Sequence, residues 1–443
     1  MKIKQFEDES LAHYSYAVLS ECEQKIILID PARNPQPYYD YAETNNATIV
    51  GVIETHPHAD FVSSHLEIAE TTGATVYISE KVNVFYPHQG FDEGRSVELG
   101  KIKLTAVNTP GHSPDSICIL LEHRGVQKAV FTGDTLFIGD CGRPDLREGA
   151  GSIRLDRNEL AKMMYHSLHQ KLAVLNDDVI VYPAHGAGTL CGKNLSSERQ
   201  STIGEEKQTN WSLQPQSEED FVKELLSDQP FIPAYFPFDV ELNRKGAAPF
   251  RQNVGKVPFS ESMPETEAGI FTVDIREEQK YKQGALPYSI NLMGGGKFET
   301  WLGSIIRPEE PFYLAGDKRE DVYAMIERAA AIGYETQLKQ AFVLSAGPVK
   351  TEKLDVEKFR NHTGDYTIVD VRNESEVKHN KIFENSISVP LGLLRQHINR
   401  IPAGKPIVVH CAGGYRSAAG SSLIRSLLPD LTVYDLGDTI KTF

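Results

Sequence analysis

The sequence is poor in the features that mark secreted, membrane-spanning and nucleic-acid-binding proteins. Its five cysteines are few for 443 residues, odd in number and widely spaced, which is typical of a reducing compartment rather than of a disulfide framework. No window approaches the roughly 18 apolar residues of a membrane span, and the charged first residues lack an apolar signal-peptide run. With 61 acidic against 46 basic residues and a formal charge of −15, the chain has no clustered basic face for a phosphate backbone. We therefore expect a cytoplasmic protein with neither a membrane nor a nucleic-acid partner.

The chain is too long for a single hydrophobic core, and at roughly 100–200 residues per domain its length predicts several domains. In its first half, β-branched and aromatic runs such as 48–53 and 75–78 predict strands, whereas 61–71 and 217–227 predict helices. Residues 237–269 hold Pro, Gly, Ser and Asn without a period and predict a linker. Beyond them, Thr-Val-Asp-Ile-Arg around Asp274 parallels Ile-Val-Asp-Val-Arg around Asp370, which indicates a duplicated α/β domain.

Metal-capable side chains follow several of the predicted strands. His56, His58 and Asp60 stand at alternate positions in the loop after strand 48–53, where three ionisable groups beside a buried strand need a compensating charge. Small residues flank each further candidate, so that the backbone can turn and approach closely. Those further candidates, each after a later strand, are His112, Asp134 and His185. Together the four segments predict a metal centre at the strand ends.

In order and content these segments resemble the metallo-β-lactamase superfamily, whose motif is Thr-His-x-His-x-Asp-His followed by a later His, Asp and His. The resemblance covers about residues 1–230 and implies an αββα sandwich with the site at its edge. The last His of the motif is Phe61 in this chain, which removes a ligand of the second metal that the binuclear hydrolases hold. One metal, held by His56, His112 and Asp134, remains, and two imidazoles with one carboxylate leave open positions that suit ferrous iron and O₂.

The same triad is the one that persulfide dioxygenases of this superfamily use, so the resemblance implies one Fe(II) per chain. By the same analogy His58, Asp60 and His185 orient ligands or substrate. Two loop segments add to the likeness. Arg143, in Cys-Gly-Arg-Pro-Asp, either serves the site or pairs with the nearby aspartate in a bent loop. Cys191, shortly after His185, is either a reactive thiol or a loop-packing residue.

The last cysteine, Cys411, lies between a predicted strand and a predicted helix in a Gly-rich turn. Backbone N–H groups of such a turn point inward and Arg416 adds positive charge, which together favour a thiolate over a thiol. The segment resembles the Cys-x-x-Gly-x-Arg-Ser loop of the rhodanese family over about residues 350–443, although Asn380-Lys-Ile stands where that family usually has Gly-His-Ile. The expected persulfide loop consists of Cys411, Ala412, Gly413, Gly414, Tyr415, Arg416 and Ser417.

The middle copy carries Gly316 at the position of Cys411 and therefore lacks the nucleophile. The resemblances thus imply an α/β multidomain chain in which an αββα sandwich precedes two rhodanese-like α/β domains. We expect an iron domain at 1–240, a linker at 241–264, an inactive rhodanese-like domain at 265–348 and an active one at 349–443.

The implied activity is O₂-dependent oxidation of a low-molecular-weight thiol persulfide to sulfite and thiol, with rhodanese transfer of sulfane sulfur to give thiosulfate. The carrier thiol (glutathione, coenzyme A, bacillithiol or similar) stays open, and we expect a homo-oligomer. Two alternatives remain. A zinc thioester hydrolase of the glyoxalase II type shares the fold but normally needs the second metal, and a non-catalytic sulfur carrier or persulfide sensor would use Cys411 alone.

Overall fold

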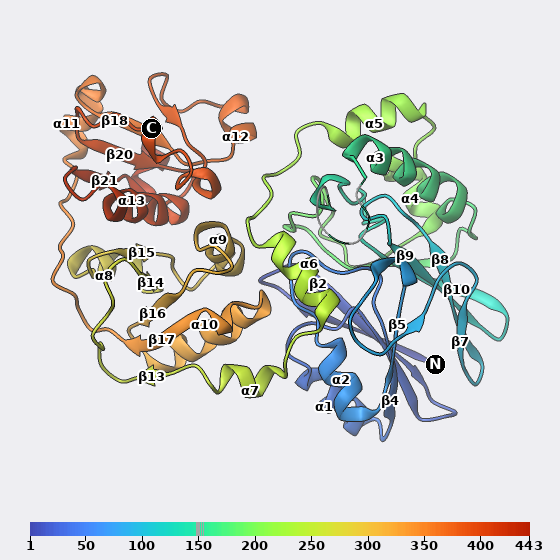
Figure 1. Cartoon of the computed structure of the whole chain (residues 1–443). Coiled ribbons are helices and arrows are strands. Elements are labelled where there is room, and N and C mark those ends of the chain that lie inside the picture. The colour runs from blue at the N-terminus through green and yellow to red at the C-terminus, as the bar shows by residue number, and fades with distance from the viewer. Residues whose placement is uncertain (148–150, 152, 154) are drawn as a thin grey trace. The chain divides into compact units, whose positions relative to one another are not determined.

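The computed structural model describes residues 1–147, 151, 153 and 155–443 (Figure 1). These residues form two compact units, Met1–Gln252 with Ala331–Gly333 and Asn253–Ala330 with Tyr334–Phe443. None of the described helices combines the length and apolar character that a bilayer crossing requires.

The described part of the first unit contains two six-stranded sheets, in the orders β1-β2-β3-β4-β5-β6 and β12-β11-β10-β9-β8-β7. Their strands are β1 (Lys2–Asp8), β2 (His13–Ser20), β3 (Lys25–Ile29), β4 (Thr48–Ile53), β5 (Thr75–Ile78), β6 (Gln89–Gly90), β7 (Ser96–Leu99), β8 (Ile102–Asn108), β9 (Ile117–His123), β10 (Val126–Gly133), β11 (Ile180–Pro183) and β12 (Ser201–Thr202). The helices of this unit are α1 (Gln36–Thr44), α2 (His65–Thr72), α3 (Arg157–His166), α4 (Ile203–Thr209), α5 (Glu218–Leu226) and α6 (Phe236–Lys245), and α7 (Phe250–Val254) spans the boundary with the second unit.

The two sheets pack face to face, with helices on both outer faces. Alternate side chains of each strand point to opposite faces, so β3 sends Ile27 and Ile29 to the inter-sheet core and Ile26 and Leu28 to the helix side. The inter-sheet core also receives Phe131 of β10. Helices α1 and α2 cover the first sheet, while α3, α4 and α5 cover the second (Figure 1). This arrangement confirms the predicted αββα sandwich.

Two local predictions differ from the structure. The helix expected over 61–71 begins only at His65, because the preceding residues are held in the loop that carries the metal-capable side chains. The segment expected as a linker carries α6, α7 and a short strand, β13 (Phe259–Ser260). Gly246, at φ +82°, ends α6 where a Cβ would meet Leu66, so this glycine marks a helix terminus rather than a flexible connection.

The second unit, as far as it is described, contains two parallel sheets of related order, β13-β17-β16-β14-β15 and β21-β20-β18-β19. The first consists of β13, β14 (Phe271–Asp274), β15 (Ser289–Asn291), β16 (Phe312–Gly316) and β17 (Leu338–Val343), and the second of β18 (Thr367–Asp370), β19 (Ile387–Ser388), β20 (Ile407–His410) and β21 (Val433–Asp435). Their helices are α8 (Glu278–Gln283), α9 (Phe298–Ile305), α10 (Arg319–Ala331), α11 (Val356–Asn361), α12 (Glu374–His379) and α13 (Tyr415–Leu427). In sheet position β16 corresponds to β20, as the repeat in the sequence predicts.

Candidate metal centre and persulfide loop

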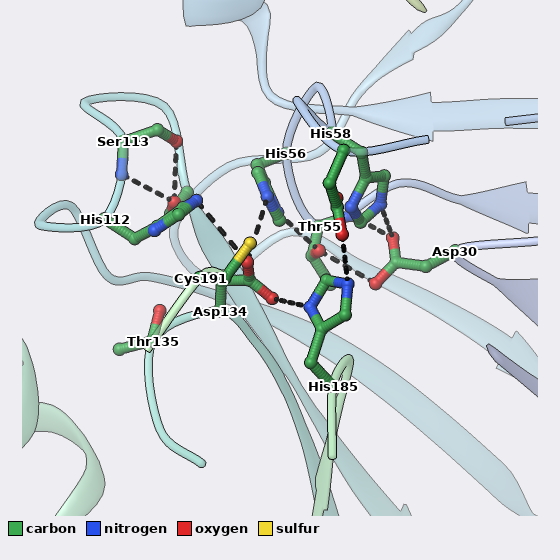
Figure 2. Close-up of polar contacts among 12 residues, drawn as sticks. Asp30, Thr55, His56, His58, His112, Ser113, Asp134, Thr135, His185 and Cys191 are labelled. Atoms are coloured by element: carbon green, nitrogen blue, oxygen red, sulfur yellow. Dashed lines mark hydrogen bonds and ion pairs between the residues drawn. The ribbon is translucent and has the colours of Figure 1, made fainter. Parts of the chain in front are cut away.

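The metal-capable side chains of the first unit converge at one end of the two sheets (Figure 2). His56, His58 and Asp60 lie in the loop after β4, and His112 follows β8. Asp134 follows β10, while the His185 loop follows β11, which pairs in parallel with β10. All six are buried, although aspartates are almost never fully buried unless they are paired and histidines are usually only partly buried. The segments that the sequence predicts as one centre therefore meet in space.

His56, His112 and Asp134 bring their ligand atoms to a common point. The Nε2 atoms of His56 and His112 lie 3.9 and 3.5 Å from Asp134 Oδ2, and the three ligand atoms lie within 4.8 Å of one another. Asp134 Oδ2 is buried and accepts no hydrogen bond from any described residue. An unsatisfied buried carboxylate oxygen is costly, and a cation between it and the two imidazoles removes that cost. The donor set of two imidazoles and one carboxylate fits Fe(II).

The outer nitrogen of each triad imidazole is held by the protein. His112 Nδ1 lies 2.9 Å from the carbonyl oxygen of Arg143, which only accepts, so Nδ1 carries the proton and the Nε2 lone pair faces Asp134. His56 Nδ1 lies 3.0 Å from Thr55 Oγ1, whose hydroxyl donates to Asp30 Oδ2 at 2.8 Å. Such outer contacts fix the tautomer and the orientation of a ligating histidine.

His185 links two carboxylates instead of pointing into the triad. Its Nδ1 lies 2.8 Å from Asp134 Oδ1 and its Nε2 lies 2.8 Å from Asp60 Oδ2. Burial lowers the pKa of His185, but the charges of Asp134 and Asp60 outweigh burial and raise the pKa well above its usual value. A ring that is protonated on both nitrogens donates one hydrogen bond to each carboxylate and offsets one of their two negative charges.

Cys191 lies beside this pair, with its sulfur in one cluster with ligand atoms of Asp60 and His185. Burial, followed by the negative charges of Asp60 and Asp134, raises the pKa of Cys191 well above that of a free thiol. These surroundings favour the protonated thiol when the centre is empty of metal. The position of Cys191 beside the site is compatible with a reactive thiol. Its protonated state is instead what a loop-packing residue would have.

His58 turns away from the triad (Figure 2). Its Nε2 lies 3.1 Å from Asp30 Oδ1 and 3.6 Å from Glu54 Oε2. Phe61 packs against the imidazole of His58 at 4.3 Å and against that of His13 at 3.9 Å, measured between ring centroids. His58 therefore lies in a buried acidic pocket behind the triad, where Phe61 covers it with an apolar ring.

Arg143 forms the ion pair that the bent-loop alternative predicted. Its Nε and Nη2 donate to the two carboxylate oxygens of Asp145 at 2.7 and 2.6 Å, and its side chain is buried. Its backbone N–H donates to the Cys191 carbonyl oxygen at 2.9 Å, while its own carbonyl oxygen contacts His112. Arg143 thus connects the Cys191 loop to a triad histidine through its backbone, and its guanidinium is occupied by Asp145.

Asn243 of α6 is a contributor that the sequence did not reveal. Its Nδ2 donates to the carbonyl oxygens of His58 and Phe61, both at 2.8 Å, and its Oδ1 accepts from the N–H of Ser63 at 2.8 Å. Tyr235, just before α6, donates its hydroxyl to the Asp60 carbonyl oxygen at 3.2 Å. These bonds satisfy the buried backbone of the motif loop and fix its course.

In the second unit Cys411 follows β20 directly and its side chain is buried. The Gly414 N–H donates to Sγ at 3.1 Å, and Gly414 has φ +100°, a conformation that favours glycine. The next residue begins α13, so Sγ lies near a helix N-terminus. Arg416 stays positively charged, but its guanidinium binds both Glu376 carboxylate oxygens at 2.5 and 2.8 Å, so a negative charge accompanies the positive charge expected beside Sγ.

In the middle copy, neighbouring side chains fill the space that a side chain at Gly316, the position of Cys411, would need. A Cβ built on Gly316 would meet Val322 Cγ2 at 2.8 Å and Ile275 Cδ1 at 3.0 Å, distances that real Cβ atoms rarely show. A cysteine would not fit there without a shift of the neighbouring side chains. The copy therefore lacks both the nucleophile and the space for one.

Comparison with known proteins agrees with this division of the chain. Residues 11–185 match the metallo-beta-lactamase superfamily and residues 355–438 match the rhodanese-like domain. The mitochondrial persulfide dioxygenase ETHE1 of Homo sapiens is 26% identical over 211 residues, which are 47% of this chain and 74% of that protein. A hydroxyacylglutathione hydrolase of Francisella philomiragia is 30% identical over 187 residues, which are 42% of this chain and 68% of that protein. The structure of a metallo-beta-lactamase from Staphylococcus aureus aligns with a TM-score of 0.69 and 29% identity, over 77% of this chain and 98% of that one.

Proposed function

Because the chain belongs to the metallo-beta-lactamase superfamily and carries a C-terminal rhodanese-like domain, we propose that it is a persulfide dioxygenase with sulfurtransferase activity. It oxidises a low-molecular-weight thiol persulfide with O₂ at one Fe(II), and Cys411 delivers sulfane sulfur to the sulfite formed. The observation that carries the proposal is the unsatisfied Asp134 Oδ2, shared by the Nε2 atoms of His56 and His112. The likeness to a persulfide dioxygenase supports the substrate class.

Ferrous iron held by His56, His112 and Asp134 would supply open coordination positions and one-electron redox chemistry, while the four electrons that reduce O₂ come from the terminal sulfur of the persulfide. Thr55 and the Arg143 carbonyl keep both imidazoles in the orientation that binding needs. The overall balance is one persulfide, one O₂ and one water to one thiol and one sulfurous acid.

His185 and Phe61 determine the charge and the number of metal ligands beside the triad. His185 donates a proton to Asp134 and another to Asp60. Burial raises the pKa of Asp134, but the positive charge of His185 is the first of the effects that bring that pKa well below its usual value, so Asp134 stays ionised. Phe61 removes the extra imidazole that a second metal would bind and packs over His58. These features support one metal rather than two.

The sulfur-transfer step needs only this chain's own thiolate. Cys411 Sγ attacks the terminal sulfur of R–S–SH, a bond from Sγ to that sulfur forms, and the donor's S–S bond breaks. The carrier leaves as its thiolate, and the proton stays with the transferred sulfur. Sulfite then attacks that sulfur, the bond between it and Sγ breaks, and Cys411 leaves as a thiolate. The transferred sulfur releases its proton to solvent, and thiosulfate is formed.

The test is metal and product analysis of anaerobically purified protein supplied with a persulfide. One iron per chain and O₂ consumption support the proposal, and His112→Ala or Asp134→Ala should lose both. His166→Ala, whose side chain is half exposed and pairs with Glu218, is the matched histidine control and should retain both. Two zinc ions with thioester hydrolysis would establish instead the hydrolase alternative, which the Francisella relative favours. Persulfidation of Cys411 without O₂ consumption would contradict the dioxygenase function and support the alternative of a non-catalytic sulfur carrier.

Two further predictions belong to this proposal. The carrier thiol is to be identified by comparing glutathione, coenzyme A and bacillithiol persulfides in the same assay. Self-association is to be tested by light scattering on the full chain.

A further inference from the structure

The helix that follows the persulfide loop, α13, lies along the open edge of the middle copy's sheet (Figure 1). β15 is the edge strand of that sheet, and β14 is its one partner among the described strands. The free side of an edge strand carries backbone N–H and C=O groups that need partners from outside the sheet. Ser422 Oγ of α13 accepts from the Asn291 N–H at 2.9 Å. Ser426 Oγ of α13 donates to the Ser289 carbonyl oxygen at 3.0 Å.

A third bond of the same kind lies at the persulfide loop itself. Tyr415, the first residue of α13, donates its hydroxyl to the Met293 carbonyl oxygen at 3.0 Å. Positions 415, 422 and 426 lie within about 40° of one another around a helix of 3.6 residues per turn, so they share one helix face. Their partners alternate along β15 and its continuation, so their backbone groups share one strand edge. The three bonds therefore form one seam between α13 and the middle copy.

The middle copy fixes the stretch that accepts the Tyr415 bond. Met293 is followed by three glycines, which would leave the backbone there with much conformational freedom. Arg328 of α10 donates to the carbonyl oxygens of Gly294 and Gly296 at 2.6 and 3.1 Å. The same guanidinium pairs with the buried carboxylate of Glu299 at 2.5 and 2.6 Å. The stretch is thus held from inside the copy that lacks a nucleophile.

Tyr415 joins this fixed stretch to the sulfur of the other copy. Burial raises the pKa of Tyr415, so its hydroxyl keeps the proton that it donates to the Met293 carbonyl oxygen. Gly414, the residue before it, donates its N–H to Cys411 Sγ at 3.1 Å. Because consecutive Cα atoms are held about 3.8 Å apart, a displacement of Tyr415 also displaces the Gly414 N–H relative to Sγ.

We propose that Tyr415 is a positioning residue, which anchors the persulfide loop to the middle copy and thereby keeps the Gly414 N–H directed at Cys411 Sγ during sulfur transfer. The inference rests on the proposed function of Cys411 and gives the copy without a nucleophile a part in that function. The transfer step is the one given above, with no further reactant.

Tyr415→Phe tests the anchor, because phenylalanine keeps the ring and removes only the hydroxyl. The net contribution of a neutral hydrogen bond corresponds to about a 2–12-fold change in an equilibrium. A loop that occupies the competent position less often by such a factor should transfer sulfur about two- to tenfold more slowly.

Two other variants separate positioning from stability. Ser426→Ala removes a bond of the same seam about three helical turns beyond Tyr415, so it should cost a similar amount of stability without displacing the first turn of α13. Tyr434→Phe is the matched control for the change from tyrosine to phenylalanine. The Tyr434 hydroxyl donates to the exposed Glu352 at 3.2 Å and lies outside the seam.

The experiment measures the loading of Cys411 in the full chain in a single turnover, without O₂ or sulfite, by the gain of one sulfur atom in intact-protein mass. Glutathione persulfide is the donor, and its concentration is varied until the loading rate is saturated. Cys411→Ser gives the background from the other cysteines. Urea unfolding of each variant gives its stability, so that rates are compared among folded proteins.

We expect Tyr415→Phe to lower the saturated loading rate about two- to tenfold, with no change in the donor concentration that gives half of that rate. Ser426→Ala and Tyr434→Phe should load at the wild-type rate.

Three results overturn the inference but leave the function of Cys411 intact. The first is an unchanged rate in Tyr415→Phe. The second is an equal slowing in Tyr415→Phe and Ser426→Ala, which loss of stability alone would cause. The third is a slowing that saturating donor abolishes, which would assign Tyr415 to donor binding. Failure of the wild type to load Cys411 overturns the proposed function itself.

Discussion

Thr55→Val tests whether the metal triad depends on its outer contacts. The threonine side chain is buried, and its hydroxyl serves Asp30 Oδ2 at 2.8 Å and His56 Nδ1 at 3.0 Å. Valine preserves the volume and removes both bonds. In the variant the Asp30 carboxylate still accepts from the Thr55 N–H at 2.7 Å and still contacts His58 Nε2 at 3.1 Å, so it loses only the contact with the hydroxyl. Loss of a hydrogen bond to a buried charged group costs about 1.5–3 kcal/mol of unfolding free energy.

The effect on metal binding should be separate from the effect on stability. Losing an outer partner of a ligating histidine lowers metal affinity by roughly 10–100-fold. Iron affinity is measured by competition with a chelator under anaerobic conditions, and stability by urea unfolding of the metal-free protein. Thr105→Val is the matched control, because the Thr105 hydroxyl makes no hydrogen bond to any described residue. If Thr55→Val bound iron within twofold of the wild type, the geometric role assigned to Thr55 would be refuted.

Three other changes probe separate parts of the molecule. Phe61→His should raise metal content above one per chain, since it restores an imidazole beside Asp60; unchanged stoichiometry would show that Phe61 is not what limits it. Cys411→Ser should keep O₂ consumption while the product changes from thiosulfate to sulfite, and thiosulfate at the wild-type rate would contradict the division of labour. Burial lowers the pKa of His65 to about 3, below the unfolded value of about 6.5, so unfolding takes up a proton and stability is lost as pH falls from 6.5 toward 3. His65→Phe should therefore reduce the loss of unfolding free energy between pH 7 and pH 5 by about 2 kcal/mol, measured by urea titration of the metal-free protein.

The parts of the fold that the sequence predicts well are those that local patterns determine. The strands expected at 48–53 and 75–78 are β4 and β5, because β-branched runs bounded by polar residues have few alternatives. Ser217 caps α5, with its Oγ accepting from the Asp220 N–H at 3.1 Å. The metal-capable residues were recognisable because each follows such a strand.

The parts that the sequence did not predict depend on distant contacts. Asn243 binds the backbone of the motif loop from a helix in the expected linker, and no local pattern distinguishes it from a surface asparagine. His13 packs on Phe61 from the start of β2, far from every other site residue in the sequence. The Glu376 carboxylate that binds Arg416 belongs to a helix N-terminus, where a glutamate is expected for capping alone. In each case tertiary packing assigns the partner.

The paired Asp and Arg that revealed the repeat have a consequence for how such pairs are used to annotate sequences. In the copy with the nucleophile, Arg372 binds Asp370 at 2.6 Å, and in the copy without it Arg276 binds Asp274 at 2.6 Å. The buried ion pair is thus also present in the copy that lacks the nucleophilic cysteine. The pair is an architectural element that fixes the chain as it leaves the strand, and its occurrence in a genome identifies the scaffold without indicating whether the copy is enzymatically competent.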